Sequence, residues 1–472
     1  MLRNYKQKAY VTGSVSVTQS LRTPLVSFAG RWFRMIKERK IALCLLVVVL
    51  LFTLGGCNRQ PVLNDAQAVN EEKISIINND KHEDITQELI ALVENDEELK
   101  CLLEKSIREA KDLNPDLDTN PVVDLESYYD FIDFCYKCLP WQICPSERYI
   151  SLYDKINQGM GCLYFVCDQP LEELENKGYY HNSLMYHEPF RTWFTKFLKV
   201  SGEELSKETS WCDEYYQNAL QNKDFHLDDD TYEDPGNWHS FNDFFARRLK
   251  EASVRPITSS DDDSVVVAPA DSCPQGVWDI DGNNKIVNTN ENEHEGIVIK
   301  TGKLTDVSVL LGDSQYANSF KNGKMTHTFL DINDYHRYHF PISGTIREVL
   351  LIPQDDAPGG VITWDKENGC YVEYYSETFG WQSIETRGIV IVETDNGGLV
   401  AIVPVGMCQV SSVNFEDNVT VGTKVNKGDP LGYFLFGGSD IVMLFSEDLE
   451  FSLITNTEHL LMGEKYGSIK SE

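Results

Sequence analysis

A serine that follows two glycines is the first candidate for chemistry in this sequence. Ser439 comes directly after Gly437-Gly438, between two apolar runs. The glycines allow backbone conformations that other residues avoid, and a tight hairpin would also explain them. A serine becomes a nucleophile when a base takes its proton and a third group orients that base. His339 and Asp271 could supply both functions.

Two histidines three residues apart are the candidates for proton transfer. His336 and His339 lie in the polar segment Asp334–His339. On a strand this spacing turns the side chains to opposite faces, whereas on a turn they can converge. Such a pair suits acid–base chemistry near neutral pH, although a surface loop explains it equally well. Asp271, after a valine run, could stabilise a histidine cation or simply form a turn.

These residues belong to four short segments, which are Phe241–Lys250, Pro269–Asp271, Asp334–Gly344 and Gly438-Ser439. Taken alone, the first segment is an amphipathic helix with a basic end. Together the four resemble the pyruvoyl-dependent phosphatidylserine decarboxylase family, whose motifs F-x-x-F-F-x-R-x-L-K, P-A-D, D-Y-H-R-x-H-x-P-x-x-G and G-S occur in this order. The resemblance covers about residues 235–460. It is specific because four motifs match in sequence.

The resemblance implies a proenzyme that cuts its own chain between Gly438 and Ser439. The Ser439 hydroxyl would attack the Gly438 carbonyl carbon, with His339 taking the proton and Asp271 holding that histidine. The ester would then eliminate to dehydroalanine, which hydrolyses to a pyruvoyl group at the start of an α chain of residues 439–472. The β chain would end at Gly438. The pyruvoyl group is the implied cofactor, no metal is implied, and His336 would reprotonate the substrate after CO2 leaves.

Two positions depart from the family pattern. The residue after the serine is often Thr or Ser in the family, and here it is Asp440. A carboxylate there could oppose the negative charge that develops during the attack, or it could form a hydrogen bond if protonated. The usual P-A-D-G ends in Ser272 here, a change that we expect to be harmless.

Two substrates are compatible with the resemblance. Conversion of phosphatidylserine to phosphatidylethanolamine, with release of CO2, fits a protein that is anchored to a membrane. Alternatively, Thr386–Ile389, Glu393–Asn396, Phe436–Ser439 and a helical extension at about 120–240 resemble the tryptophan decarboxylase-like branch, which acts on a free aromatic amino acid. A third hypothesis is a surface lipoprotein that no longer cleaves itself and is not an enzyme.

An α+β architecture is expected to position these residues. From Ile85 apolar residues recur at three- and four-residue steps, which predicts helices, and Asp84 with Gln87 resembles a capping box. We therefore expect a helical N-terminal domain at 84–250. Short β-type runs then dominate, with a hairpin signal at Asp395–Gly398. They predict a β-rich, barrel-like or sandwich-like catalytic domain at 251–472.

The N-terminal segment resembles that of an exported lipoprotein. Ile41–Leu54 is an uncharged apolar run behind a basic flank, with the length of a signal-peptide core rather than of a membrane span. It leads into Cys57 in a sequence that resembles a bacterial lipobox, and an uncleaved anchor helix is the alternative. We expect residues 1–57 to be a signal segment, Cys57 to be lipidated, and residues 58–83 to be a flexible tether to the membrane.

The charge balance is strongly acidic. The chain has 74 Asp and Glu residues against 42 Lys and Arg, a net charge of -32. Such a surface repels phosphates, so nucleic acid is not expected as a partner. The acidic runs Asp228–Asp230 and Asp261–Asp263 are expected to be solvated loops, with metal binding as the alternative.

Cysteines are numerous, at twelve in the chain. The closest cluster is Cys135, Cys138 and Cys144, which lacks the second C-x-x-C pair that a zinc site usually has. Cys162 and Cys167 lie near it in sequence. Disulfides in an exported chain and buried free thiols are both compatible with this pattern.

Overall fold

The computed structural model describes residues 82–137, 143, 148–152, 158–175, 177, 181–288, 306–353, 361–374, 381–407, 412–455 and 458–471. The expected signal segment, the lipidation site Cys57 and the tether up to residue 81 lie outside these residues, as do Cys138 and Cys144. Within the described part, no helix is both long enough and apolar enough to cross a membrane.

The N-terminal part of the described chain is helical, as the apolar spacing predicts. Along the second helix Leu99, Leu103 and Ile107 are buried at four-residue steps, so one face packs inward. The helices are α4 (Asp84–Asn95), α5 (Glu97–Leu113), α6 (Leu125–Tyr136), α7 (Gln158–Cys167), α8 (Phe190–Glu204), α9 (Asp213–Gln221), α10 (Phe241–Phe245) and α11 (Val307–Leu310).

The start of the first helix differs from the expectation. α4 begins at Asp84, so its N-cap is Glu83, and no side-chain hydrogen bond closes that cap. The Gln87 amide donates instead to the His82 carbonyl at 2.6 Å. The predicted capping box at Asp84 and Gln87 is therefore wrong, because Asp84 already lies inside the helix. A capping box does form at the start of α6, between Asp124 and Ser127.

The second half of the described chain is built of strands. They are β1 (Val265–Val267), β2 (Cys273–Ile280), β3 (Ile286–Asn288), β4 (Lys324–Leu330), β5 (Arg337–His339), β6 (Gly344–Ile352), β7 (Val361–Asp365), β8 (Cys370–Tyr374), β9 (Thr386–Glu393), β10 (Leu399–Met407), β11 (Val413–Phe415), β12 (Lys424–Val425), β13 (Pro430–Phe434), β14 (Gly438–Phe445), β15 (Leu449–Leu453) and β16 (Lys465–Ser471). The hairpin predicted at Asp395–Gly398 joins β9 to β10 and is confirmed.

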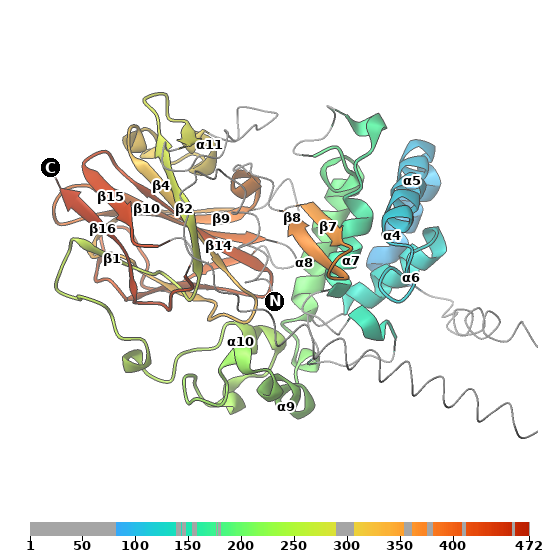
Figure 1. Cartoon of the computed structure of the whole chain (residues 1–472), viewed down its shortest axis with the longest axis horizontal. Coiled ribbons are helices and arrows are strands. Elements are labelled where there is room, and N and C mark those ends of the chain that lie inside the picture. The colour runs from blue at the N-terminus through green and yellow to red at the C-terminus, as the bar shows by residue number, and fades with distance from the viewer. Residues whose placement is uncertain are drawn as a thin grey trace, which may run out of the picture. The chain divides into compact units, whose positions relative to one another are not determined.

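Eight strands form one sheet in the order β12-β6-β9-β10-β14-β4-β2-β3, and its central strands run next to one another in Figure 1. Smaller sheets contain β1-β16-β15, β11-β13-β5 and β7-β8. The expected α+β class is confirmed. Among the described strands, however, the large sheet ends at β12 and β3 without pairing them, so the barrel expectation is not met.

Both faces of the large sheet are buried, and they alternate along β14. Ile441, Met443 and Phe445 belong to one hydrophobic cluster. Val442 and Leu444 belong to another on the opposite face. Because side chains alternate along a strand, Ser439 lies on the first of these faces and Asp440 on the second.

A separate hydrophobic cluster gathers the helices α4 to α8. The β7–β8 hairpin joins it, since Tyr371 is buried in that cluster and its hydroxyl donates to the Thr119 carbonyl at 2.8 Å. Residues 80–472 form one compact unit. The domains predicted at 84–250 and 251–472 both fall inside that unit, and the boundary between them stays a prediction.

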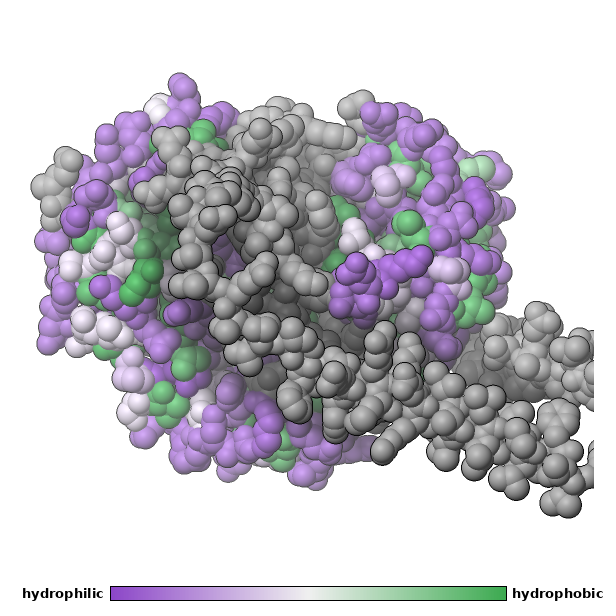
Figure 2. Space-filling model, viewed as in Figure 1, coloured by the Kyte–Doolittle hydropathy of each residue, from purple (hydrophilic) through white to green (hydrophobic). Residues whose placement is uncertain are grey.

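The described surface is polar on the face shown in Figure 2, where apolar residues appear only in small separate groups. Cys162 and Cys167 are free thiols, and both are buried. Burial raises the pKa of Cys162 to about 12, which keeps this thiol protonated. For these two residues the structure answers the open alternative in favour of buried thiols.

Candidate active site

Ser439 stands at the start of β14 and contacts a histidine. Its Oγ lies 3.0 Å from His336 Nδ1, and both side chains are fully buried. His336 ends the loop that precedes β5, and its carbonyl accepts a hydrogen bond from Phe434 N–H at 2.9 Å. The sheets thus bring together two residues that lie 103 positions apart in sequence.

The hydrogen bonds of His336 determine which ring nitrogen carries the proton. Nε2 lies 3.1 Å from the Asp331 carbonyl and 3.2 Å from the Ile332 carbonyl. Carbonyl oxygens only accept, so Nε2 is protonated and donates. In the neutral ring Nδ1 is then the acceptor, and the Ser439 hydroxyl donates to it. This is the arrangement that a general base needs.

Burial keeps His336 neutral. Desolvation, followed by the nearby positive charge of Arg247, lowers its pKa from 6.5 to about 3. The ring also stacks on Phe245, with centroids 3.8 Å apart and an angle of 24° between the planes. At neutral pH the Nδ1 lone pair is therefore available to the serine.

Helix α10, which lies in the motif Phe241–Lys250, contacts both His336 and the segment that precedes Ser439. Asn242 Oδ1 accepts a hydrogen bond from Phe436 N–H at 2.9 Å, which anchors the chain just before the glycine pair. Phe436 also packs edge-on against Phe241 and Phe245, with centroids 5.4 and 5.3 Å away. The side chains of this motif therefore fix the approach of the Gly438–Ser439 segment to His336.

Arg247 does not form the exposed basic end that an amphipathic helix would have. The helix stops at Phe245, and Arg247 is fully buried. Its guanidinium donates to the carbonyls of Asn333 at 2.9 Å and Asp334 at 3.2 Å, and it lies 4.3 Å from the centre of the Tyr232 ring. The expectation for this segment taken alone was wrong because a buried carbonyl cluster binds the charge. Arg247 thereby braces the loop that carries His336.

Asp334 links the same loop to the chain segment after Ser439. Its Oδ2 accepts from Asp331 N–H at 2.7 Å, and its Oδ1 lies 2.9 Å from His459 Nε2. Burial raises the pKa of Asp334 to about 6, against the lowering effect of His459. Since Asp331 also accepts from His336, Asp334 acts on the position of that ring through the backbone.

His339 and Asp271 lie together, but their hydrogen bonds do not lead to Ser439. His339 Nδ1 donates to the Gly428 carbonyl at 2.8 Å, and its Nε2 lies 3.2 Å from the Tyr335 hydroxyl. Asp271 accepts from Arg255 Nη2 at 2.9 Å and from Met462 N–H at 2.8 Å. The charge of Asp271 favours the protonated form of His339, while burial lowers its pKa.

The contact seen at Ser439 differs from the one that the resemblance implies. The resemblance pairs His339 with the serine, whereas here His336 occupies that position. The spacing explains why only one histidine reaches Ser439. His336 lies in the loop before β5 and His339 within the strand, where the backbone turns its ring toward Gly428. The roles of Asp271, His336, His339 and Ser439 remain predictions.

Asp440 faces away from Ser439 across the sheet. It is fully buried, and its Oδ1 forms a hydrogen-bonded ion pair with His327 Nε2. Its Oδ2 has no hydrogen-bond partner among the described residues. The carboxylate therefore lies on the other face from the serine hydroxyl.

One cluster in the helical part has metal-ligand chemistry. The ligand atoms of His82, Asp130 and Asp133 lie within 4.8 Å of one another. Asp133 already pairs with His82 at 2.7 Å, and Asp130 with Arg148 at 3.3 Å. These contacts account for the cluster without an ion.

Known proteins resemble the part of the chain that holds the serine and both histidines. Residues 241–468 match the family model described as phosphatidylserine decarboxylase. Phosphatidylserine decarboxylase proenzyme 2 of Oryza sativa subsp. japonica is 31% identical over 49% of this chain and 34% of its own length. L-tryptophan decarboxylase of Psilocybe cyanescens is 30% identical over 44% of this chain and 46% of its own length.

A bacterial relative is matched more completely. The phosphatidylserine decarboxylase proenzyme of Vibrio parahaemolyticus is 27% identical over 51% of this chain and 82% of its own length. In contrast, the chain spans less than half the length of the rice and Psilocybe relatives. The resemblance to the phosphatidylserine decarboxylase family, with relatives among tryptophan decarboxylases, is confirmed for residues 241–468.

Proposed function

We propose that this chain is a self-processing, pyruvoyl-dependent decarboxylase that converts phosphatidylserine to phosphatidylethanolamine and CO2. The observation that carries the proposal is the buried 3.0 Å contact between Ser439 Oγ and His336 Nδ1, at a Gly-Ser bond. The names of the rice and Vibrio relatives support both the substrate and a proenzyme that must be processed.

Self-processing follows from the groups at this bond. Ser439 Oγ attacks the Gly438 carbonyl carbon while His336 Nδ1 takes the hydroxyl proton. The C–O bond forms, the C–N bond breaks, and the proton passes to the released amine of Ser439. Loss of the Cα proton and cleavage of the Cβ–O bond then leave a carboxylate on Gly438 and dehydroalanine at position 439. One water hydrolyses the dehydroalanine to pyruvoyl with release of ammonia.

The residues around position 439 fit a pyruvoyl group. The side chains of Ser439, His336, Phe245 and Phe436 are all at most 1% exposed. When formed, the group supplies a carbonyl that accepts the electrons of the departing carboxyl group. His336 contacts residue 439 through Nδ1, so once this nitrogen has taken up a proton from water it can pass that proton to the substrate carbon. Phe245 and Phe436 exclude the water that would compete for that carbon.

A free aromatic amino acid is the second candidate substrate. The L-tryptophan decarboxylases of two Psilocybe species match about the same share of this chain as the phospholipid enzymes do. The two candidates differ in the amine that they release, phosphatidylethanolamine or tryptamine.

An assay of the full chain with each substrate tests the proposal. Phosphatidylserine in mixed micelles and free L-tryptophan are incubated separately with the wild-type chain and with Ser439→Ala. We expect phosphatidylethanolamine from the wild type and none from the variant. Tryptamine alone would replace the lipid substrate by the amino acid. A processed chain that releases neither amine would contradict both.

We further propose that the chain is exported and anchored through a lipid on Cys57. The support is the apolar run Ile41–Leu54 behind its basic flank and the Gly55-Gly56-Cys57 sequence that follows. Labelled palmitate should enter the wild-type chain in bacterial cells and not the Cys57→Ser variant. Equal labelling of both would contradict the anchor, whatever the outcome of the decarboxylase assay.

A further inference from the structure

A cavity lies beside α9, outside the candidate active site. Its volume is about 520 Å³, within the range of small-molecule sites. The residues that line it are Glu208, Trp211, Cys212, Asp213, Tyr216, Pro235, Gly236, Trp238 and His239. Neither the four motifs nor the proposed self-processing uses this cavity.

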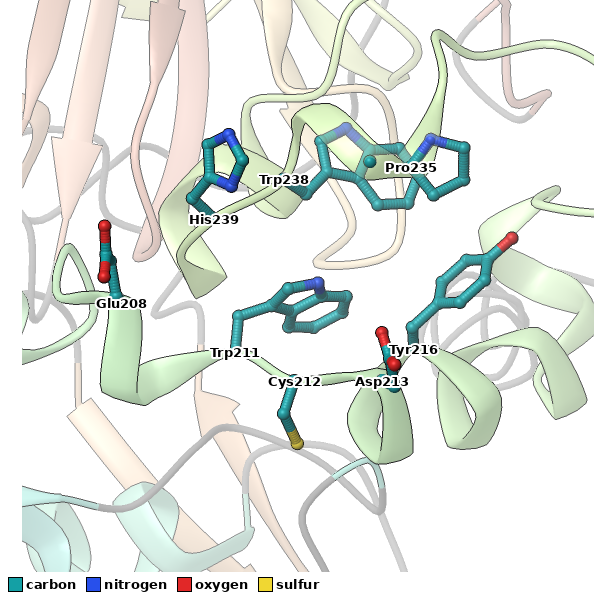
Figure 3. Close-up of a pocket in the computed structure, with 9 residues that line it drawn as sticks. Glu208, Trp211, Cys212, Asp213, Tyr216, Pro235, Trp238 and His239 are labelled. Atoms are coloured by element: carbon teal, nitrogen blue, oxygen red, sulfur yellow. The ribbon is translucent and has the colours of Figure 1, made fainter.

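Three aromatic rings form the walls. In Figure 3, Trp211 lies across the cavity from Trp238, and the Tyr216 ring borders one end. Trp211 stacks on Phe244 at an angle of 15°, whereas Trp238 stands at 68° to the same ring. The two indoles are therefore steeply inclined to each other. Tyr216 is also steeply inclined to Trp238, at 70°.

The carboxylates of the cavity lining belong to Glu208 and Asp213, and His239 supplies an imidazole. Asp213 lies next to Tyr216 at one end, and Glu208 lies at the other beside His239 (Figure 3). Among the described residues that line the cavity, none is Lys or Arg. Inclined aromatic faces with carboxylates at their edge attract an organic cation through the ring quadrupoles and the negative charges. The same lining repels a carboxylate or a phosphate.

The walls are held in place before a ligand arrives. Phe244 covers one face of Trp211, which leaves the other for the cavity. The Trp238 indole N–H donates to Glu233 Oε1 at 3.4 Å, and that oxygen also accepts from Arg248 N–H at 2.9 Å. A pre-formed aromatic site loses little conformational entropy on binding.

We propose that this cavity binds the ammonium group of a small organic amine without a carboxylate, such as a quaternary or primary monoamine. The Cys212 side chain points away from the rings in Figure 3 and takes no part. A free amine is favoured over a zwitterionic phospholipid headgroup, because no Lys or Arg among the described residues of the lining can pair with the phosphate. The site does not depend on cleavage at Ser439.

Titration of the full chain with choline tests the site. Ligand-observed NMR compares choline with 3,3-dimethylbutan-1-ol, its neutral isostere, and with glycerophosphocholine, which carries the lipid phosphodiester. We expect choline to bind at least about tenfold more tightly than the isostere. Equal binding of choline and the isostere, or no choline binding at tens of millimolar, would overturn the proposal. Glycerophosphocholine binding as tightly as choline would overturn the assignment to a free amine and indicate a lipid headgroup.

Variants locate the binding within the cavity. Tyr216→Ala removes one ring and should weaken choline binding about fivefold, and Asp213→Asn should weaken it about twofold. Glu214→Gln is the matched control, since Glu214 is exposed on the same helix and does not line the cavity. A melting temperature equal to that of the wild type shows that each variant folds. Unchanged affinity in Tyr216→Ala and Asp213→Asn would place the ligand elsewhere and refute the site.

Ser439→Ala separates this inference from the proposed function. The variant should bind choline with wild-type affinity even if it produces no amine. A loss of choline binding in Ser439→Ala would mean that the ligand occupies the candidate active site instead, which contradicts a separate cavity.

Discussion

The loop that ends at His336 and the strand that carries His339 hold two histidines with opposite hydrogen-bond patterns. His336 donates from Nε2 to two carbonyls and accepts at Nδ1 from Ser439. His339 donates from Nδ1 to Gly428 and meets Tyr335 at Nε2. His336 thus presents an unprotonated ring nitrogen to Ser439, whereas His339 links two neighbouring segments of the chain. The neighbours of each ring, rather than its residue type, determine what it can do.

Removal of each histidine should give the largest difference between the two regions. His336→Ala deletes the acceptor of the Ser439 proton, so self-cleavage should slow by at least about 100-fold. His339→Asn keeps a donor for the Gly428 carbonyl and should slow cleavage by about tenfold or less. Fragment appearance is followed by gel after cell-free synthesis. A slower reaction in His339→Asn than in His336→Ala would restore the pairing that the family resemblance implies.

Arg247→Met tests what holds the His336 loop in place. The change leaves two buried carbonyls, of Asn333 and Asp334, without their charged donor. We expect a loss of about 3 kcal/mol in unfolding free energy and cleavage that is slower by about tenfold. Chemical denaturation and the same cleavage assay measure the two effects. Arg248→Met, at an exposed neighbouring position, is the control. Equal effects of both variants would contradict a specific bracing role for Arg247.

The pH dependence of cleavage sharpens the comparison further. The pKa of His336 is lowered from 6.5 to about 3, so its base form persists and the cleavage rate should not decline around pH 6.5.

The same groups make stability depend on pH. The unfolded chain protonates His336 more readily than the folded chain does, so the unfolding free energy decreases as the pH falls from 6.5 toward 3. Asp334 affects stability in the opposite direction, because its pKa is raised from 3.8 to about 6 in the folded chain. Its contribution to the unfolding free energy is present at low pH and is lost as the pH rises through 6.

Rates of precursor cleavage between pH 5 and 8.5 test this assignment, with Asp334→Asn as the matched variant. If the cleavage rate changes with a midpoint near pH 6 and this change vanishes in Asp334→Asn, its cause is the titration of Asp334, which pairs with His459. A decline near pH 6.5 that persists in the variant would show that an ordinary histidine, and not the depressed His336, is the base.

The smallest effect is expected at the residue after the serine. Asp440→Asn keeps an oxygen acceptor for His327 and removes the negative charge on the far face of the sheet. Cleavage should change by no more than about threefold, because the sheet separates this charge from the Ser439 hydroxyl. An acceleration of tenfold or more would show that the carboxylate opposes the attack after all.

Much of this arrangement could be predicted from the sequence. The apolar steps of α5, the β9–β10 hairpin and the order of the four motifs depend on local patterns, and each is found in the structure. The start of α4 at Asp84, with Glu83 as its N-cap, and the open sheet could not be predicted in this way. They depend on which partner each backbone group finds in three dimensions.

The site was predictable only to the level of residue types. Ser439, His336, His339 and Asp271 all lie in the described core, but their pairing follows from long-range contacts. Arg247 and Asn242 lie inside the motif Phe241–Lys250, but the sequence does not show that both side chains are buried. His459 carried no sequence signal, because its partner Asp334 lies 125 positions away.

Intact mass of the purified full chain, beside its Ser439→Ala variant, tests the central claim most directly. We predict two wild-type fragments that meet between Gly438 and Ser439, with a pyruvoyl group at the start of residues 439–472, and a single uncut chain in the variant. An uncut wild-type chain, or cleavage that survives in Ser439→Ala, would contradict self-processing at this bond.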